Sequence, residues 1–466
     1  MNYYFLGIGG IGMSALARYF KQRGDNVSGY DRTETELTRR LQSEGIDIHY
    51  DDNPTLIPDN IDLVVYTPAV PTDLNEYQHL LSTGVTMKKR SQVLGELTRG
   101  KKCIAVAGTH GKTTTSAMIA YLLTKSDIGC TAFLGGIAKN FDSNLVVNND
   151  SQYVVVEADE YDRSFLQLHP FYSVITATDP DHLDIYGTHK NLVDAFQQFA
   201  NQTDPDGAIV LKEGLTGHEH EHDHDDHEEH EDHEEYHLTI GQEIKQFSYS
   251  ARSIEANYYA INVRNYNGNL FFDLRTPDKV LYDIELTNSC LYNVENAVAA
   301  AAIALLCGLD EHQLRYGLKT FSGIRRRFDV RIKNKDIVYI DDYAHHPKEI
   351  AATLESIHYL YPGKRVVGLF QPHLYSRTRD LADQFAEALK PLDEIILLPI
   401  YPAREKPIPG VSSGMILRKI ESMNKYLCTP DQAADLVEAL CPDVVVTMGA
   451  GNIDLLVPVI EERLKQ

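Results

Sequence analysis

The stretch Ala105-Val-Ala-Gly-Thr-His-Gly-Lys-Thr-Thr-Thr115 decides the fold of this chain. It continues the apolar run Cys103 to Ala107 and precedes a helical pattern with apolar side chains on one side, which predicts a strand, a turn and a helix start. In such a turn, backbone N–H groups and the positive end of the helix dipole hold phosphate. Lys112 is placed to reach the outer phosphates, and the Thr113 hydroxyl can complete the ligand shell of Mg²⁺.

The match to the phosphate-loop pattern G-x-x-x-x-G-K-[ST] is imperfect. Val106 stands where the first glycine belongs, and the glycine comes later, at Gly108. A plain strand-to-helix turn with a chance Gly-Lys-Thr is therefore an alternative interpretation of this stretch taken alone.

Composition indicates a globular protein of several domains. A length of 466 residues corresponds to about three domains, and 43% hydrophobic residues suffice for several cores. No apolar run reaches the ~18 residues that cross a bilayer, and no export signal is visible at the start of the chain. The six cysteines are scattered without a close pair, unlike zinc knuckles or a disulfide framework. We therefore expect a cytoplasmic protein that does not bind membranes.

The acidic balance is concentrated in one segment. Of the net charge of −23, the 11 acidic residues of 218–237 supply almost half, and this segment has no Lys or Arg. The remaining −12 gives no support for nucleic-acid binding, which requires a basic face. Eight histidines alternate with these acids without any aliphatic residue, so the sequence predicts a disordered loop over 217–237. Incidental binding of Zn²⁺ or Ni²⁺ is the other role that this composition permits.

The beginning of the chain carries a second glycine motif. The pattern G-x-G-x-x-G at Gly7, Gly9 and Gly12 lies between a short strand and a helix pattern, and a second strand ends in Asp31. This layout is typical of a nucleotide-binding βαβ unit, in which the glycines allow close approach of phosphate and the acid binds a ribose hydroxyl. Alone, it would suggest a nicotinamide-dependent oxidoreductase, and a purely structural turn is the remaining interpretation.

Polar side chains follow two further strands of the central segment. The strand Gln152 to Val156 ends at Glu157, and the strand Tyr172 to Thr176 leads to His182. Because ligands sit beyond the carboxyl ends of parallel strands, we expect both side chains to meet the Lys112 loop in one crevice. A carboxylate suits Mg²⁺, and an imidazole does so less commonly. Taken singly, Glu157 could equally be a capping acid and His182 a structural histidine.

The last third of the chain alternates strands with helical patterns, which predicts another open parallel sheet. The predicted fold class is therefore α/β with three domains: a Rossmann-like domain over 1–97, a central ATPase-type domain with a mostly parallel sheet over 98–321, and a second Rossmann-like domain over 322–466.

With these motifs in place, the chain resembles the Mur ligases, the ATP-dependent amide-forming enzymes of peptidoglycan precursor synthesis. The motifs recur in family order over nearly the whole chain, and the family's phosphate loop has the same Gly-Thr-His-Gly-Lys-Thr form. The matching stretches are Gly7–Ser14, Gly108–Thr114, Glu157–Glu160, Asp181–Asp184, Asn293–Asn296, Arg326–Phe328, Asp341–Pro347, Phe370–His373 and Gly449–Asn452.

The resemblance implies a reaction and its reactants. With ATP and Mg²⁺, L-alanine would be joined to the lactyl carboxylate of UDP-N-acetylmuramate through an acyl phosphate. Attachment of a preformed tripeptide to the same sugar acid is the nearest alternative. The resemblance further implies a UDP-sugar-binding first domain, an ATP-binding central domain, an amino-acid-binding last domain, and a monomer or weak homodimer.

Site residues are implied position by position. The ATP contacts would be Gly108, Thr109, His110, Gly111, Lys112, Thr113, Thr114, Asn293, Asn296 and Arg326. The metal ligands would be Thr113, Glu157 and His182. The substrate contacts would be Gly9, Gly10, Ile11, Gly12 and Asp31 for the UDP-sugar, and Tyr343, His345, His373 and Arg377 for the amino acid. The catalytic residues would be Lys112, His182, His345 and His373, the last two as candidate bases.

Two positions depart from the family pattern. Tyr292 stands where these enzymes commonly have His, and Leu374 stands where a basic residue often follows Pro-His. A tyrosine cannot make the pair of ring hydrogen bonds that a histidine makes. A structural alternative also exists for the last domain, in which His345 and His346 only cap the helix that Pro347 begins.

Overall fold

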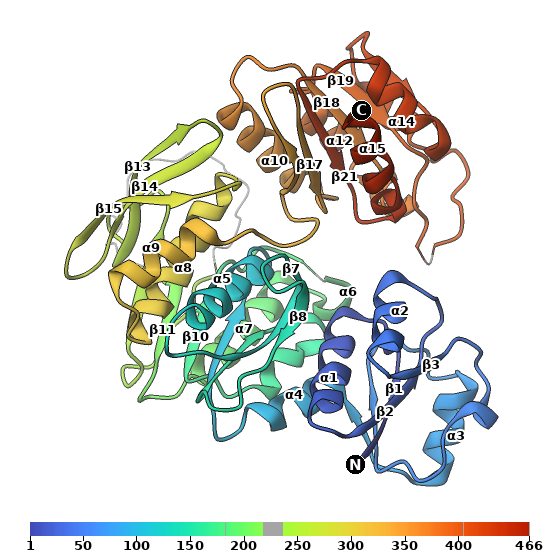
Figure 1. Ribbon diagram of the computed structural model, residues 1–466, viewed down its shortest axis with the longest axis vertical. Helices are drawn as coiled ribbons and strands as arrows, with labels where there is room; N and C mark the ends of the chain where they lie inside the picture. Colours follow the sequence, from blue (N-terminus) through green and yellow to red (C-terminus); the bar gives the residue numbers. More distant parts are fainter. Residues whose placement is uncertain (182, 218–235, 404, 466) are drawn as a thin grey trace, which may run out of the picture. The chain divides into compact units, whose positions relative to one another are not determined.

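The computed structural model describes every residue except 182, 218–235, 404 and 466 (Figure 1). The predicted metal ligand His182 and nearly all of the predicted loop 217–237 therefore lie outside the described residues. The chain divides into two compact units. The first unit consists of residues 1–261, 273–282 and 295–318, and the second consists of residues 262–272, 283–294 and 319–466.

The first sheet is entirely parallel and has the strand order β3-β2-β1-β4-β5. The central strand β1 is buried along Tyr4–Leu6, as a parallel sheet covered on both faces requires. Its elements are β1 (Asn2–Leu6), α1 (Ile11–Gln22), β2 (Asn26–Tyr30), α2 (Glu36–Ser43), β3 (Asp47–His49), η1 (Pro54–Leu56), β4 (Leu63–Tyr66), α3 (Asn75–Thr83), β5 (Met87–Lys89) and α4 (Arg90–Thr98).

The second sheet has the order β15-β14-β13-β12-β11-β10-β6-β9-β7-β8 among the described residues. Strands β11, β10, β6 and β9 are parallel, so their carboxyl ends meet at one edge, whereas β7 and β8 form an antiparallel pair. Its strands are β6 (Lys102–Ala107), β7 (Thr131–Ala138), β8 (Ser143–Val146), β9 (Tyr153–Glu157), β10 (Tyr172–Ile175), β11 (Ala208–Lys212), β12 (Gln246–Ser250), β13 (Tyr258–Tyr266), β14 (Asn269–Arg275) and β15 (Val280–Leu286).

Each of the three strands that the sequence predicted in this central segment, at 103–107, 152–156 and 172–176, is followed by a helix. Helix α5 begins directly after the glycine-containing turn and is buried along most of its length. Helix α8 is Ala-rich, and the boundary between the two compact units falls within it, after Val294. The helices are α5 (Lys112–Thr124), η2 (Tyr161–Gln167), α6 (Leu183–Tyr186), α7 (His189–Asn201), α8 (Tyr292–Leu306) and α9 (Glu311–Thr320).

The third sheet has the order β16-β17-β21-β18-β19-β20, with only the β16–β17 pair antiparallel among the pairs described. Its strands are β16 (Asp329–Lys333), β17 (Val338–Asp342), β18 (Val366–Phe370), β19 (Glu394–Leu397), β20 (Lys425–Leu427) and β21 (Val444–Met448). Its helices are α10 (Pro347–Leu360), α11 (Tyr375–Asp380), α12 (Ala382–Leu389), α13 (Gly414–Lys419), α14 (Pro430–Ala439), η3 (Asn452–Leu456) and α15 (Val457–Leu464).

These three mostly parallel sheets confirm the predicted α/β fold class. Each sheet falls within one of the ranges 1–97, 98–321 and 322–466, although the domain limits themselves stay a prediction. Within the described part of the chain, no helix combines the length and the apolar character needed to cross a bilayer.

Candidate functional site

The turn between β6 and α5 accepts only glycine at two positions. Gly108 has φ +128°, and an added Cβ would lie 2.1 Å from the Thr176 hydroxyl oxygen. Gly111 has φ +82°, and its Cβ would lie 2.6 Å from Asn296 Oδ1. Both positions need a left-handed backbone and close approach, which glycine alone combines. The predicted nucleotide contact Asn296 therefore lies directly against this loop.

The residues directly after β10 hold the loop in place. The Thr109 N–H donates to the Ala177 carbonyl at 3.1 Å, and the Thr176 hydroxyl donates towards the carbonyls of Ala107 and His110. The N-cap residue of α5 is Gly111, which has no side chain to cap the first turn, where the predicted contacts Thr113 and Thr114 lie. The start of this helix is thus a fixed backbone surface of the kind that binds phosphate.

Lys112 folds back over the turn. Its Nζ donates to the Gly108 carbonyl at 2.6 Å and to Glu160 Oε1 at 2.8 Å. The Glu160 side chain is only 1% exposed, so the ion pair is shielded from water. Glu160 was not among the predicted site residues, although it ends the matching stretch Glu157–Glu160. The ammonium is therefore already positioned over the loop by two oxygen atoms of the protein.

Glu157 ends β9 beside the same loop. It pairs in register with Val106 on β6, and its carboxylate fills the space over Gly135, where an added Cβ would lie 2.2 Å from Oε2. The described residues contain no group of three or more His, Cys, Asp or Glu side chains that could hold a metal ion. A magnesium ion that accompanies a nucleotide takes much of its ligand shell from phosphate and water, so a single carboxylate beside a phosphate loop fits it.

The glycine turn after β1 is organised by Asp31. The Gly9 N–H donates to Asp31 Oδ2 at 2.7 Å, and the Thr33 N–H donates to Oδ1 at 3.2 Å. An added Cβ at Gly9 would lie 2.8 Å from Oδ2, which explains the glycine. Asp31 therefore shapes the turn, and its predicted contact with a ribose hydroxyl stays a prediction.

A cavity of about 270 Å³ joins this glycine turn to the end of β9. The predicted contacts Gly10, Ile11 and Gly12 line it together with Glu157. Arg90, which the sequence analysis missed, also lines it and donates from Nη2 to Asp159 Oδ2 at 3.1 Å. The first two sheets thus contribute the predicted sugar-nucleotide turn and the predicted metal ligand to one space.

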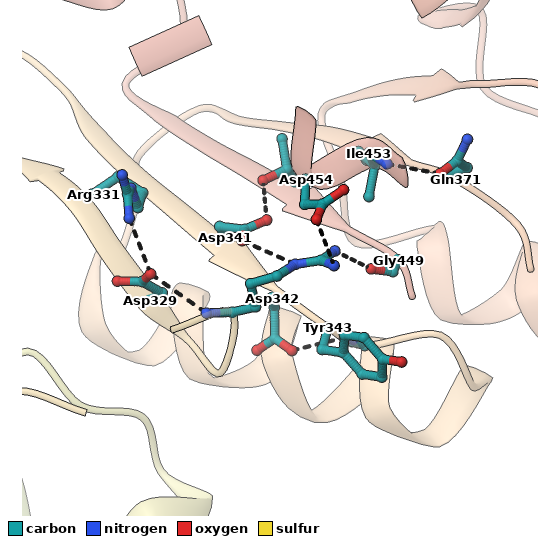
Figure 2. A network of polar contacts seen from close by, with 12 residues as sticks. Asp329, Arg331, Asp341, Asp342, Tyr343, Gln371, Gly449, Ile453 and Asp454 are labelled. Atoms are coloured by element: carbon teal, nitrogen blue, oxygen red, sulfur yellow. Dashed lines mark hydrogen bonds and ion pairs between the residues drawn. The ribbon is translucent and has the colours of Figure 1, made fainter. Parts of the chain in front are cut away.

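In the second compact unit, Arg326 contacts Asp341, Gly449 and Asp454, which lie at the carboxyl edge of the third sheet (Figure 2). Its Nη2 donates to the Gly449 carbonyl at 2.5 Å, and its guanidinium lies 3.5 Å from Asp341 Oδ2 and 3.7 Å from Asp454 Oδ2. Burial raises the pKa of Asp341 to about 6, which the positive charge of Arg326 opposes. The predicted ATP contact Arg326 is therefore held by oxygen atoms of its own unit.

Tyr292 has a defined partner in the same unit. Its hydroxyl donates to Asp342 Oδ2 at 3.1 Å, and Asp342 also accepts the N–H groups of Phe328 and Ala344 at 3.0 and 2.9 Å. The tyrosine at the family's histidine position thus ties the start of α8 to the end of β17. The neighbouring Asn293 is buried in the first turn of α8.

The predicted amino-acid residues gather at the ends of β17 and β18. The rings of His345 and His373 lie 6.1 Å apart, and the ring of His373 stacks on that of Tyr401 at 5.7 Å. The buried atoms His373 Nδ1 and Arg377 Nη1 have no hydrogen-bond partner among the described residues. Burial and the Arg377 charge lower the pKa of His373 to about 4, and burial lowers the pKa of His345. Both imidazoles are consequently neutral near pH 7.

The capping alternative holds for one histidine of the pair only. His346 is the N-cap of α10 and accepts the Lys348 N–H on Nδ1 at 3.4 Å. The His345 ring lies instead against the Tyr343 carbonyl, with Nδ1 3.1 Å from its oxygen. The predicted contact Tyr343 lies under two guanidinium groups, those of Arg326 at 5.2 Å and Arg327 at 5.0 Å from its ring centroid.

Comparison with known proteins places the chain in a family. Three models match: the Mur ligase family catalytic domain over residues 2–102, the Mur ligase middle domain over 106–304 and the Mur ligase glutamate ligase domain over 326–451. A UDP-N-acetylmuramate–L-alanine ligase of Parabacteroides distasonis is 47% identical, with 99% of this chain and 96% of the relative covered.

Solved structures agree. The UDP-N-acetylmuramate-alanine ligase of Thermotoga maritima superposes with a TM-score of 0.82 at 28% identity, covering 100% of this chain and 99% of that one. A murein peptide ligase of Psychrobacter arcticus shares the fold, with a TM-score of 0.67, 20% identity and coverage of 100% and 98%. The resemblance inferred from the motifs is confirmed, and the chain belongs to the Mur ligase family.

Proposed function

We propose that this protein joins L-alanine to the lactyl carboxylate of UDP-N-acetylmuramate, with ATP converted to ADP and phosphate. Full-length relatives at 41–47% identity that carry the name of this activity support it. The structural observation that carries the proposal is the cavity in which the turn Gly10–Gly12 faces Glu157, at the end of the strand that pairs with the phosphate-loop strand.

The first step activates the carboxylate, since a free carboxylate has no adequate leaving group. One of its oxygens attacks the γ-phosphorus of ATP, the bond to the β–γ bridging oxygen breaks, and an acyl phosphate and ADP result. Lys112 supplies positive charge at the transferring group. For this its Nζ must either leave Glu160 and bind phosphate oxygens, or bind both at once. Thr113, Glu157 and His182 would hold Mg²⁺, which neutralises phosphate charge when bound.

The second step forms the amide. The alanine amine attacks the acyl carbon, the carbon–nitrogen bond forms, and the carbon–oxygen bond to phosphate breaks. The amine must first give up a proton, and the imidazoles of His345 and His373, which are neutral near pH 7, are the candidate acceptors. Arg377, with a buried N–H that lacks a partner among the described residues, would bind the alanine carboxylate.

Two alternatives receive less support. A ligase for a preformed tripeptide is represented among the similar solved structures by two murein peptide ligases at 20% and 22% identity, a similarity that shows the fold alone. A nicotinamide oxidoreductase would leave the Lys112 loop without a role. We place the reaction in the cytoplasm, in keeping with six free cysteines, and expect a monomer or weak homodimer.

The test is phosphate release from ATP with UDP-N-acetylmuramate, with and without L-alanine, glycine, L-serine or a tripeptide. We expect release that depends on the sugar nucleotide and on L-alanine, together with the alanyl product by mass spectrometry. Release that depends on the tripeptide in place of L-alanine would overturn the proposal in favour of the recycling activity.

A further inference from the structure

Arg90 occupies a position to which none of the predicted roles was assigned. It is the first residue of α4, and its side chain is 19% exposed. Its guanidinium lies against the first turn of α1, because an added Cβ at Gly12 would lie 2.8 Å from Nη1 and 3.1 Å from Cδ. The third glycine of the G-x-G-x-x-G motif is therefore needed here to leave room for an arginine from another helix.

The charge distribution of the cavity makes this arginine significant. Among the described residues that line it, Arg90 is the single cation, and it faces two carboxylates, Glu157 and Asp159. The adjacent Lys89 does not line the cavity, and its ammonium binds Asp162 at 2.7 Å. An anionic occupant would be repelled by both carboxylates, so it requires the Arg90 guanidinium, whose Nη2 contacts Asp159 while its Nη1 lies towards Gly12.

The position within the cavity selects the anionic group. The N-terminal turn of α1, over which the guanidinium lies, is a backbone surface that favours phosphate. Arginine presents several N–H donors in one plane and binds two phosphate oxygens at once. The carboxylate that reacts must instead approach the Lys112 loop, where the phosphoryl group is transferred.

We infer that Arg90 anchors the diphosphate of the sugar nucleotide over the first turn of α1, while its Nη2 contact with Asp159 fixes this anchor to the segment that begins at Glu157. This inference rests on the proposed function and adds a residue to the UDP-sugar site. Arg90 thereby acts as a specificity-determining residue for nucleotide diphosphate sugars, and it sets the distance from the diphosphate to the reacting carboxylate.

The experiment is calorimetric binding without ATP or alanine, using UDP-N-acetylmuramate and UDP-N-acetylglucosamine, which has the diphosphate but lacks the lactyl carboxylate. For Arg90→Met we expect affinity for both ligands to fall by a similar factor of about 30, and for Arg90→Lys by a smaller factor, since a lysine binds phosphate as a point charge. The matched control Lys89→Met, which removes a neighbouring ion pair to the same segment, should stay within about twofold of the wild type on both ligands.

The other results of the binding experiment overturn the inference. Loss of affinity for UDP-N-acetylmuramate alone would mean that Arg90 binds the carboxylate, and unchanged affinity for both would mean that it binds neither. An equal loss in Lys89→Met would assign the effect to the ion pairs of the segment. Thermal denaturation identifies variants that have unfolded. If Arg90→Met does not fold, the test is made with Arg90→Lys. This binding assay contains no ATP and does not depend on catalysis. A wild-type enzyme that binds both ligands here, yet forms no alanyl product in the separate phosphate-release test, would overturn the proposed function only.

Discussion

The phosphate loop and the histidine cluster differ in whether their polar side chains have hydrogen-bond partners within the protein. In the loop, the cation Lys112 already has two partners, Glu160 and the Gly108 carbonyl. In the cluster of His345, His373 and Arg377, buried nitrogen atoms of two members have no partner among the described residues. The Lys112 ammonium is therefore paired before any ligand binds, whereas the two nitrogen atoms of the cluster are not, although the loop also holds one buried hydroxyl oxygen, Thr109 Oγ1, without a partner among the described residues.

This difference separates two kinds of binding energy. At the loop, phosphate oxygens replace protein oxygens, so the net gain on ground-state binding is small and the charge acts when the phosphoryl group is transferred. At the cluster, a ligand supplies hydrogen bonds that were absent, so the gain appears directly as affinity. Substitutions in the first region should therefore lower kcat, and those in the second should raise KM.

Lys112→Met gives the largest expected effect. Removing the charge at the transferring phosphoryl group should lower kcat by about 10³-fold or more, while ATP affinity changes by less than tenfold, because Glu160 already competes for the ammonium. Single-turnover phosphate release measures the rate of the chemical step, and calorimetric ATP binding measures the affinity. A variant with normal kcat and lost ATP affinity would contradict the distinction drawn for this region.

Gly108→Ala tests whether close packing against Thr176 and Ala177 fixes the conformation of the loop. Its Cβ would lie 2.1 Å from the Thr176 hydroxyl oxygen and 2.7 Å from the Ala177 nitrogen, at φ +128°. We expect a loss of ATP affinity of about 10²-fold and a lower melting temperature. The matched control Gly100→Ala also has a positive φ, +73°, with nothing within 4 Å, so it should cost only about 1 kcal/mol of stability and no activity. Equal effects at both positions would show that backbone strain alone matters.

Much of the fold followed from sequence, because strand ends carry the chemistry. The glycine turns and Glu157 stand immediately after apolar runs, and a parallel sheet brings such ends to one edge. Residues outside that pattern were missed. Glu160 lies beyond a strand end, and Arg90 opens a helix in a stretch without a glycine motif. Both act through a partner distant in sequence, Lys112 and Gly12, which periodicity does not reveal.

The departures from the family pattern also needed coordinates. Whether Tyr292 is a nucleotide contact depends on where its hydroxyl points, and the structure directs it to Asp342. At the second departure, Leu374 has φ +73°, and its N–H donates to the Tyr401 carbonyl. That backbone bond lies beside the stacked pair His373 and Tyr401, so the position contributes through its main chain. Neither fact follows from the residue type.

Arg377→Met tests the second region. If a substrate carboxylate accepts a hydrogen bond from the unpartnered Arg377 Nη1, removal of this guanidinium should raise the KM for L-alanine by about 10²- to 10³-fold, with a smaller change in kcat and none in ATP affinity. Arg379→Met, on the same helix, is the matched control, because Arg379 is exposed and binds only Asp380 among the partners described. A kcat effect that exceeds the KM effect would place Arg377 in the chemical step.

Asp341→Asn should give the smallest effect of these substitutions, and we expect it in the free energy of unfolding, not in activity. Burial holds the pKa of Asp341 at about 6, above the 3.8 of an unburied carboxyl, so the folded state binds a proton that the unfolded state has released. The unfolding free energy therefore falls as pH rises from about 4 and levels off above about 6, by at most about 3 kcal/mol.

Asparagine carries no such titration, so the urea midpoint of Asp341→Asn relative to the wild type should rise between pH 4.5 and 7.5. The exposed Asp336→Asn, in the same unit, controls for general effects of removing a carboxylate. A midpoint difference that stays constant with pH would mean that Arg326, 3.5 Å away, fully compensates the burial of this carboxyl. In that case burial of Asp341 would not lower the free energy of unfolding. At the carboxyl edge of the third sheet, only the histidine cluster would then hold buried polar groups at a cost in stability when no ligand is bound.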